Sequence, residues 1–333
     1  MIPARSQHDR LLHRAACLTA AAALLLPILV GTFVTTTDSG MAIRGWLTAD
    51  GYPLLTYPWF RAAWDKFLEH GHRLAGIVIG CLTLGLVALS WGRGGRRERR
   101  WSAALLIAVI VQGALGGQRV LLDSRGLAMI HGIVASWVFG LMVLFAVVTG
   151  QTWERLEMQG RTPRHDVGLA YGMVALVLIQ YVLGAFLRHR GTALYEHLGF
   201  AMLILAGAAW ILAAATWRSV PELTHSARWV AGLAALQACL GLATYVARFG
   251  LSEEQFPLLA GWGWTGWAPR ALGTEQIVLR SLHVLAGMLL WAAVLRHAAL
   301  ASRSSRTYGA VVNPAARELP PASAGPAMKG AVS

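Results

Sequence analysis

The chain has 333 residues, of which 56% are hydrophobic and 14% charged, and its mean hydropathy is +0.52. This balance excludes an ordinary water-soluble domain and indicates an integral membrane protein. The formal net charge of +13 needs no nucleic-acid partner, because the arginines gather in short segments between apolar runs, where they can face anionic lipid.

Eight apolar segments are long enough to cross the hydrocarbon core as helices. In chain order they are residues 15–36, 74–91, 101–120, 131–150, 167–187, 197–217, 229–246 and 277–295. We therefore expect an all-α integral membrane fold with eight transmembrane helices as two pseudo-symmetric four-helix bundles. The bundles would comprise residues 1–150 and 151–300. They would be followed by a disordered cytoplasmic tail, 301–333, which is rich in proline, alanine, serine and glycine.

The first segment has two interpretations. Arg5, Arg10 and Arg14 precede the apolar run, as in a signal peptide. The run is longer than a usual signal core and no clear small-x-small cleavage site follows it, which favours a retained helix. With the N-terminus in the cytoplasm, the arginine-rich segments 91–100 and 151–166 are also cytoplasmic, in agreement with the positive-inside rule. The C-terminus is then cytoplasmic as well.

Four histidines recur at one topological place, near the start of each even-numbered helix, on the predicted extracytoplasmic side. They are His72, His131, His197 and His283. Any one of them could be an interfacial histidine bonded to a loop carbonyl. As a set they favour metal ligation, and two haems, each held by two neutral imidazoles between helices, suit this pattern better than zinc.

A repeated motif accompanies the histidines. The pattern Gln-x-x-Leu-Gly places Gln112 before Gly116, Gln180 before Gly184 and Gln237 before Gly241, and the first helix has only the glycine, Gly31, in register. Such glycines allow close approach of a neighbouring helix or of a flat macrocycle. Several arginines near the histidines could meet haem propionates or could be solvated loop residues: Arg73, Arg119, Arg125, Arg188, Arg190 and Arg280.

The sequence "EHGHR" distinguishes the first half. Glu69 precedes His72 by three residues, on the same helical face, whereas Glu196, beside His197, points to another face. Glu69 could stabilise a cationic intermediate or relay protons in a low-dielectric site, or it could be a solvated helix cap. His70 is a local alternative to His72 as the ligand.

These motifs resemble those of the haem A synthase family. The resemblance spans residues 15–300 and is carried by "GTFVTTTDSGMAIRGW" (31–46), "EHGHR" (69–73), "QGALGGQRVLLDSRGLAMIHGIVAS" (112–136), "EHLGFA" (196–201) and "RSLHVLAG" (280–287). It implies an oxidoreductase of the bacterial cell membrane that oxidises the C8 methyl of haem O, through two successive oxidations and loss of water, to the formyl group of haem A for respiratory oxidase assembly.

The resemblance also implies roles for individual residues. His72 and His131, with Arg73, would bind the substrate haem O, and Glu69 would serve the oxidation. His197 and His283, with Arg280, would bind a haem b cofactor through its iron. Expected partners are haem O and haem A, the lipid bilayer, an external electron donor such as a ferredoxin-type protein, and a haem O synthase.

Two departures from the family pattern are present. The stretch "VTTTDSG" lacks an arginine that many members have there, and no external cysteine pair occurs. Cys17, Cys81 and Cys239 lie within predicted helices, where we expect small packing residues. The Trp-rich segment 251–276 could be an interfacial belt or a lid. Two other functions remain open: a di-haem b-type cytochrome that only transfers electrons and, less well supported, a transporter made of repeated helical halves.

Overall fold

The computed structural model of the chain describes residues 7–156, 162–250 and 273–312. Eight helices among these residues are long and apolar enough to cross a membrane, which confirms the predicted all-α transmembrane fold. Large apolar side chains such as Ile107 and Trp210 are more than half exposed on the outer helix faces. An apolar surface of this kind is stable against lipid and costly in water. The chain is thus a multi-pass membrane protein.

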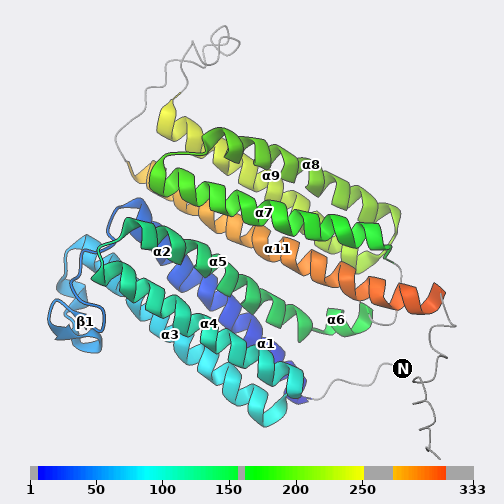
Figure 1. The fold of residues 1–333 in the computed structure, drawn as a ribbon, viewed down its shortest axis with the longest axis horizontal. Helices are drawn as coiled ribbons and strands as arrows, with labels where there is room; N and C mark the ends of the chain where they lie inside the picture. The colour runs from blue at the N-terminus through cyan, green and yellow to red at the C-terminus, as the bar shows by residue number, and fades with distance from the viewer. Residues whose placement is uncertain (1–6, 157–161, 251–272, 313–333) are drawn as a thin grey trace, which may run out of the picture.

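The first half of the chain forms one group of four antiparallel spans (Figure 1). Its elements are α1 (Gln7–Ala23), the π-helical turn η1 (Leu24–Ile28), α2 (Leu29–Thr36), α3 (Trp64–Arg93), α4 (Arg96–Leu121) and α5 (Arg125–Val148). The short helix α6 (Gln151–Leu156) follows. α1, η1 and α2 together form the first span, and the π-helical turn contains Pro27. Proline has no backbone N–H and cannot complete a regular α-helical turn, so the hydrogen-bond pattern changes there.

The second half forms the other group of four spans, α7 (Arg164–Arg190), α8 (Leu194–Trp217), α9 (Pro221–Phe249) and α11 (Thr274–Val312). Helix α11 also packs on α2 and α5 of the first group, and α7 packs on α5. At this boundary Trp291 Nε1 donates to the carbonyl of Ser136 at 2.9 Å, and the indole fills the space beside Gly140. The division of the chain at residue 150 into two domains, and a symmetry relation between them, stay predictions.

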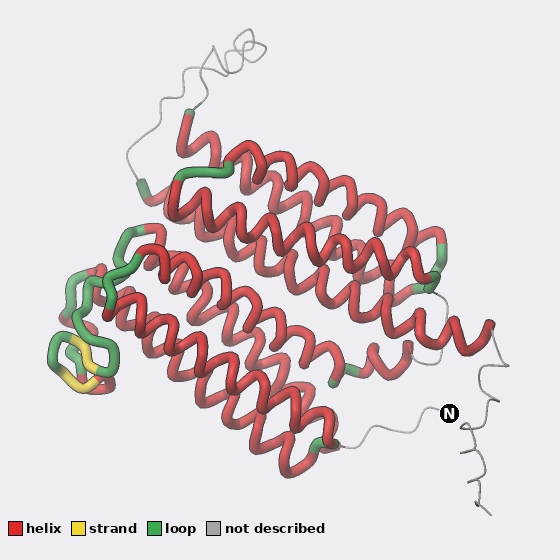
Figure 2. Tube along the Cα trace, viewed as in Figure 1, coloured by secondary structure: helices red, strands yellow, loops and turns green. Residues whose placement is uncertain are grey.

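The connection between the first and second spans is a folded loop, residues 37–63 (Figure 2). It contains a hairpin of β1 (Thr48–Ala49) and β2 (Tyr52–Pro53), followed by the 3-10 turns η2 (Leu54–Thr56) and η3 (Trp59–Arg61). Asp50 and Gly51 form the two-residue turn, both with positive φ. The sequence Asp-Gly is a recognised signal for such a turn, and we did not expect this hairpin.

Helix boundaries differ from the prediction at the ends. α3 begins at Trp64 rather than at residue 74, so "EHGHR" lies inside the helix and not before it. α11 continues to Val312, so residues 301–312 of the expected tail are helical, while 313–333 lie outside the described residues. Hydropathy locates the part of a helix that matches the hydrocarbon core, and polar turns extend helices beyond that core.

Candidate functional site

The four histidines lie in two pairs, one in each group of helices. The ring centres of His72 on α3 and His131 on α5 are 6.2 Å apart, and the rings are almost perpendicular, at 83°. Those of His197 on α8 and His283 on α11 are 6.3 Å apart, at 70°. The sequence could not say which histidines meet. The structure pairs them within each half.

A glycine from an odd-numbered span lies against each histidine ring. A Cβ atom added to Gly31 would be 2.9 Å from Cε1 of His72, and one added to Gly116 would be 3.0 Å from Cε1 of His131. The corresponding distances are 3.2 Å for Gly184 with His197 and 3.1 Å for Gly241 with His283. Carbon atoms repel at such distances, so any larger residue would displace the ring. The repeated glycine is therefore needed for the position of each imidazole.

The residue four positions before each of these glycines also faces a histidine. Gln112 donates to the backbone carbonyl of His131 at 2.9 Å, and its side-chain nitrogen lies 3.1 Å from the Nδ1 atom of that ring. The side-chain nitrogens of Gln180 and Gln237 lie 3.3 Å from Nε2 of His197 and of His283, respectively. In the first span the equivalent residue is Pro27, whose carbonyl faces the His72 ring as an acceptor.

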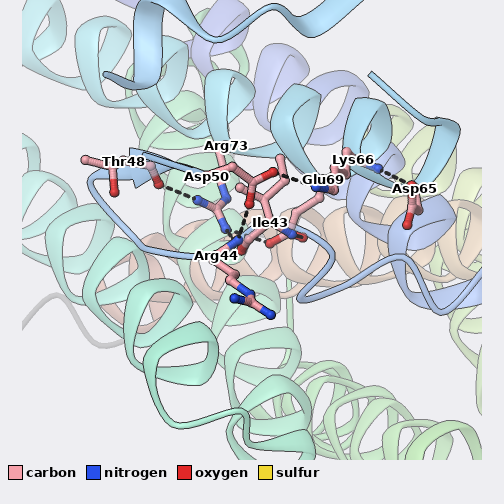
Figure 3. Close-up of polar contacts among 8 residues, drawn as sticks. All are labelled: Ile43, Arg44, Thr48, Asp50, Asp65, Lys66, Glu69 and Arg73. Carbon is pink, nitrogen blue, oxygen red and sulfur yellow. Dashed lines mark hydrogen bonds and ion pairs between the residues drawn. The ribbon is translucent and has the colours of Figure 1, made fainter. Parts of the chain in front are cut away.

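Glu69 is completely buried beside the first histidine pair, with 0% exposure. Its Oε2 accepts the backbone N–H of Ile43 at 2.9 Å, and its Oε1 accepts a guanidinium N–H of Arg73 at 2.8 Å (Figure 3). Within the described residues no other carboxylate is in the buried class. The expectation that it might be a solvated helix cap is wrong, because the carboxylate is buried and lies beyond the first turn of α3.

Arg73 fixes the loop onto the helix. Besides Glu69, its guanidinium donates to the carbonyls of Ile43 at 3.0 Å and Thr48 at 3.3 Å (Figure 3). It also donates to the carbonyl of Gly45 at 2.9 Å. Four acceptors of the protein thus occupy the guanidinium that we expected to meet a propionate. That Arg73 binds a haem propionate stays a prediction from the sequence, and these contacts do not favour it.

A second anchor holds the hairpin. Lys66 donates to Oδ2 of Asp50 at 2.6 Å, and the backbone N–H of Arg44 donates to Oδ1 at 3.0 Å. These donors, the Lys66 ammonium first, lower the pKa of Asp50 because they stabilise the ionised carboxylate. A wide recess of about 710 Å³ opens on this side of the loop, lined by Arg44, Asp50, Lys66 and neighbouring residues, and none of the four histidines lines it.

His70 faces the loop and not a second histidine. Its side chain is 2% exposed, with ring centres 4.8 Å from Tyr57 and 5.9 Å from Trp59. This placement favours His72 over His70 as the member of the pair. Sequence reasoning missed the aromatic contacts of the loop, because they depend on how residues 37–63 fold back onto α3.

The arginines near the histidines have different surroundings. Arg188 on α7 donates to the Thr32 carbonyl at 2.7 Å and to the Thr36 hydroxyl at 2.6 Å. Arg125 is 84% exposed beside Asp38, Arg190 is exposed and Arg280 is partly buried. Arg119 is almost buried, with 9% exposure.

The remaining expectations concern the cysteines and the tryptophans. The three cysteines lie within helices as expected, but their side chains are exposed rather than packed inside. Trp262, Trp264 and Trp267, the expected belt or lid, lie outside the described residues.

Comparison with known proteins adds independent information. The chain matches the COX15-CtaA family model, described as cytochrome oxidase assembly protein, over residues 14–197. It is similar to a haem A synthase of Symbiobacterium thermophilum, with 28% identity over 68% of this chain and 84% of the relative. It is also similar to a haem A synthase of Sphingopyxis alaskensis, with 25% identity over 83% of this chain and 84% of the relative. A third, from Cereibacter sphaeroides, is 30% identical over 47% of this chain and 49% of the relative. The chain therefore belongs to the haem A synthase family of cytochrome oxidase assembly proteins.

Proposed function

We propose that this protein is a haem A synthase that oxidises the C8 methyl group of haem O to a formyl group. Membership of the family supports a role in haem A biosynthesis. The observation that carries the proposal furthest is the pair of imidazoles on α3 and α5, His72 and His131, next to the buried carboxylate of Glu69.

The spacing within each histidine pair fits a haem iron. A metal to imidazole nitrogen bond of about 2 Å puts the centres of two opposite imidazoles about 6 Å apart. The measured separations are 6.2 Å for His72 with His131 and 6.3 Å for His197 with His283. Zinc would need further protein ligands, and within the described residues no group of three or more His, Cys, Asp or Glu lies together. Haem brings four equatorial nitrogens of its own, so two histidines suffice.

The surroundings of the rings also suit a metal ligand. The Nδ1 atoms of His72, His197 and His283 are buried without a hydrogen bond of good geometry to the described residues. Each ring faces a backbone carbonyl, that of Pro27, Gln180 and Gln237 in turn. A carbonyl bonded to one ring N–H would fix the neutral tautomer and leave the other ring nitrogen for iron. Small shifts of the rings on loading would complete these bonds.

The two pairs differ in what surrounds them, which suggests different tasks. Glu69 lies beside the first pair, whereas Glu196, next to His197, is exposed. We assign substrate haem O to His72 and His131, and haem b to His197 and His283 with Arg280 nearby. Haem b held there would supply one-electron redox chemistry, with electrons from an external ferredoxin-type donor.

Glu69 is positioned to act on the substrate. The Ile43 N–H and the Arg73 guanidinium each take one lone pair of the carboxylate, so one lone pair on each oxygen remains free. The free lone pairs can accept the hydroxyl proton of a partly oxidised methyl carbon, and the negative charge can stabilise positive charge that develops there. Burial strengthens both effects, because water does not screen them.

Analysis of the bound haems tests the proposal. The protein is produced in cells that make haem O, purified, and its haems are extracted and identified by chromatography and mass. We expect haem A together with haem b. Haem b with unmodified haem O would overturn the proposal and indicate an electron-transferring cytochrome.

Glu69→Gln separates binding from oxidation. The amide is similar in size and keeps an oxygen for Arg73, but it cannot carry the charge. We expect normal amounts of haem b and haem O and a strong loss of haem A. Glu196→Gln, an exposed acid beside a histidine of the other pair, is the matched control and should form haem A normally. Normal haem A from Glu69→Gln would remove Glu69 from the reaction.

A further inference from the structure

Arg119 is a buried cation whose side chain has no partner among the described residues. It lies near the end of α4 with 9% exposure, and its Nε atom is buried without a hydrogen-bond acceptor. The described part of the chain provides neither an ion pair nor a side-chain hydrogen bond for this guanidinium. A charge removed from water without a partner costs several kcal/mol. A free guanidinium in this position therefore indicates a ligand of opposite charge.

The neighbouring arginines do not share this property. Arg73 donates to Glu69 and to three loop carbonyls, and Arg188 donates to Thr32 and Thr36. Arg125 is exposed to solvent and faces Asp38. Among these arginines, Arg119 is thus the one that is nearly buried and whose N–H groups have no acceptor among the described residues.

The position of Arg119 relates it to the first histidine pair. It follows Gly116, which lies against His131, by three residues, so it is about one helical turn nearer the end of α4. Its guanidinium is within electrostatic range of His72, His131 and Glu69. Its Nη1 would be only 3.1 Å from a Cβ atom at Gly40, so the guanidinium lies directly beneath the loop.

The local charges leave one positive charge unbalanced. Glu69 and Arg73 form an ion pair at 2.8 Å and neutralise each other. Arg119 adds a further positive charge to the same buried region. One carboxylate beside Arg119 would make the region neutral, and guanidinium binds carboxylate through two parallel hydrogen bonds.

We propose that Arg119 binds a propionate carboxylate of the haem held between His72 and His131, and that Arg73 is a positioning residue for Glu69 and the loop. This inference rests on the function proposed above. It replaces the sequence-based assignment of Arg73 as the propionate ligand. The macrocycle would lie between the histidines with a carboxylate edge toward the end of α4, where polar groups are less costly than at the bilayer centre.

A comparison of two ligands tests this inference. Protein containing haem b is titrated with haem O and with haem O dimethyl ester, and binding is followed by the absorbance change of histidine-ligated haem. In the wild-type protein we expect haem O (the acid) to bind about 10- to 100-fold more tightly than its dimethyl ester. The ester has no carboxylate charge, so it loses a charged hydrogen bond to the guanidinium. In Arg119→Gln the affinity for the acid should fall to about that for the ester, which itself should change little.

Further variants make the result specific. Arg119→Lys keeps the charge but not the paired donors, and should retain part of the preference for the acid. Arg125→Gln, on the exposed arginine, should keep the full preference. Arg73→Gln should also keep the full preference for the acid over the ester. Its rate of haem A formation should fall by a larger factor than its KM for haem O rises. Haem b content and thermal unfolding of each variant show whether the protein is folded.

Each outcome decides between the possibilities. If wild type does not distinguish acid from ester, or if Arg119→Gln weakens both equally, Arg119 does not bind the propionate and its role is structural or directed to a lipid phosphate. If Arg73→Gln abolishes the preference instead, the two assignments are reversed. Because this test measures binding and not turnover, haem O that binds with the expected preference but is not oxidised would overturn the proposed function and leave the inference about Arg119 intact.

Discussion

The guanidinium of Arg188 donates to the backbone carbonyl of Thr32 at 2.7 Å, which joins α7 of the second group of helices to α2 of the first. Thr32 follows Gly31, the residue that lies against His72. The same guanidinium donates to the Thr36 hydroxyl one turn further along α2. Arg188 of the second half thus stabilises α2, the helix whose Gly31 lies against His72 of the first half.

Replacement of Arg188 by Gln should weaken the contact between the two groups of helices. Loss of hydrogen bonds from a charged donor costs about 1.5–3 kcal/mol, so the unfolding temperature in detergent should fall by several degrees. Arg190→Gln, two residues away and exposed, is the control and should leave the unfolding temperature unchanged. Equal unfolding temperatures for wild type and Arg188→Gln would contradict the role given to this contact.

The glycine of the repeated motif should be needed for haem b. In Gly241→Ala the new Cβ would be 3.1 Å from Cε1 of His283, and the ring would have to move. Disturbing the support of a metal ligand typically weakens binding about 10- to 100-fold, so the purified variant should contain much less haem b. Gly232→Ala on the same helix should keep its haem, because beyond the local helix backbone no atom of the described residues lies within 4 Å of the added Cβ. Equal haem content in the two variants would argue against haem ligation by His283.

His70 and His72 should respond differently to substitution. His70→Phe keeps an aromatic ring against Tyr57 and Trp59 and should retain substrate haem. His72→Phe removes a ligand and should abolish histidine-ligated binding of haem O, measured by absorbance titration. The opposite result would make His70 the ligand.

The anchor of the hairpin should depend on pH. Because the pKa of Asp50 is lowered in the folded protein, its stabilising contribution is present above the ordinary value of about 4 and is lost as the pH falls through the lower folded value. Asp50→Asn should therefore loosen the loop at pH 7, detected as faster hydrogen exchange of residues 43–50. Acidification to about pH 3 should increase the susceptibility of the wild-type loop to an acid protease and change the variant less. A loop equally protected in both proteins at pH 7 would show that the Lys66 contact is not an anchor.

Much of the fold was determined by the sequence itself. The apolar segments match the thickness of the hydrocarbon core, and a lipid environment requires each to satisfy its backbone groups as a helix, so eight spans could be predicted from composition and length. The repeated glycines and the histidines of the even-numbered spans were identifiable as a recurring set, because each is fixed by its register within one helix. The Asp-Gly pair at Asp50 and Gly51 is likewise a turn signal that the sequence itself contains.

Only the tertiary structure decided how these residues meet. His72 and His131 come from different helices, and Glu69 on α3 meets Ile43 of the loop 37–63. Helix periodicity says neither which helices are neighbours nor where a loop folds back. The contrast between Arg73 and Arg119 is of the same kind. Both are arginines near a helix end in the sequence. The folded loop and Glu69 accept hydrogen bonds from both terminal nitrogens of Arg73, whereas Arg119 has no partner among the described residues. A side chain's partners are set by long-range packing, and the chemistry available to it follows from those partners.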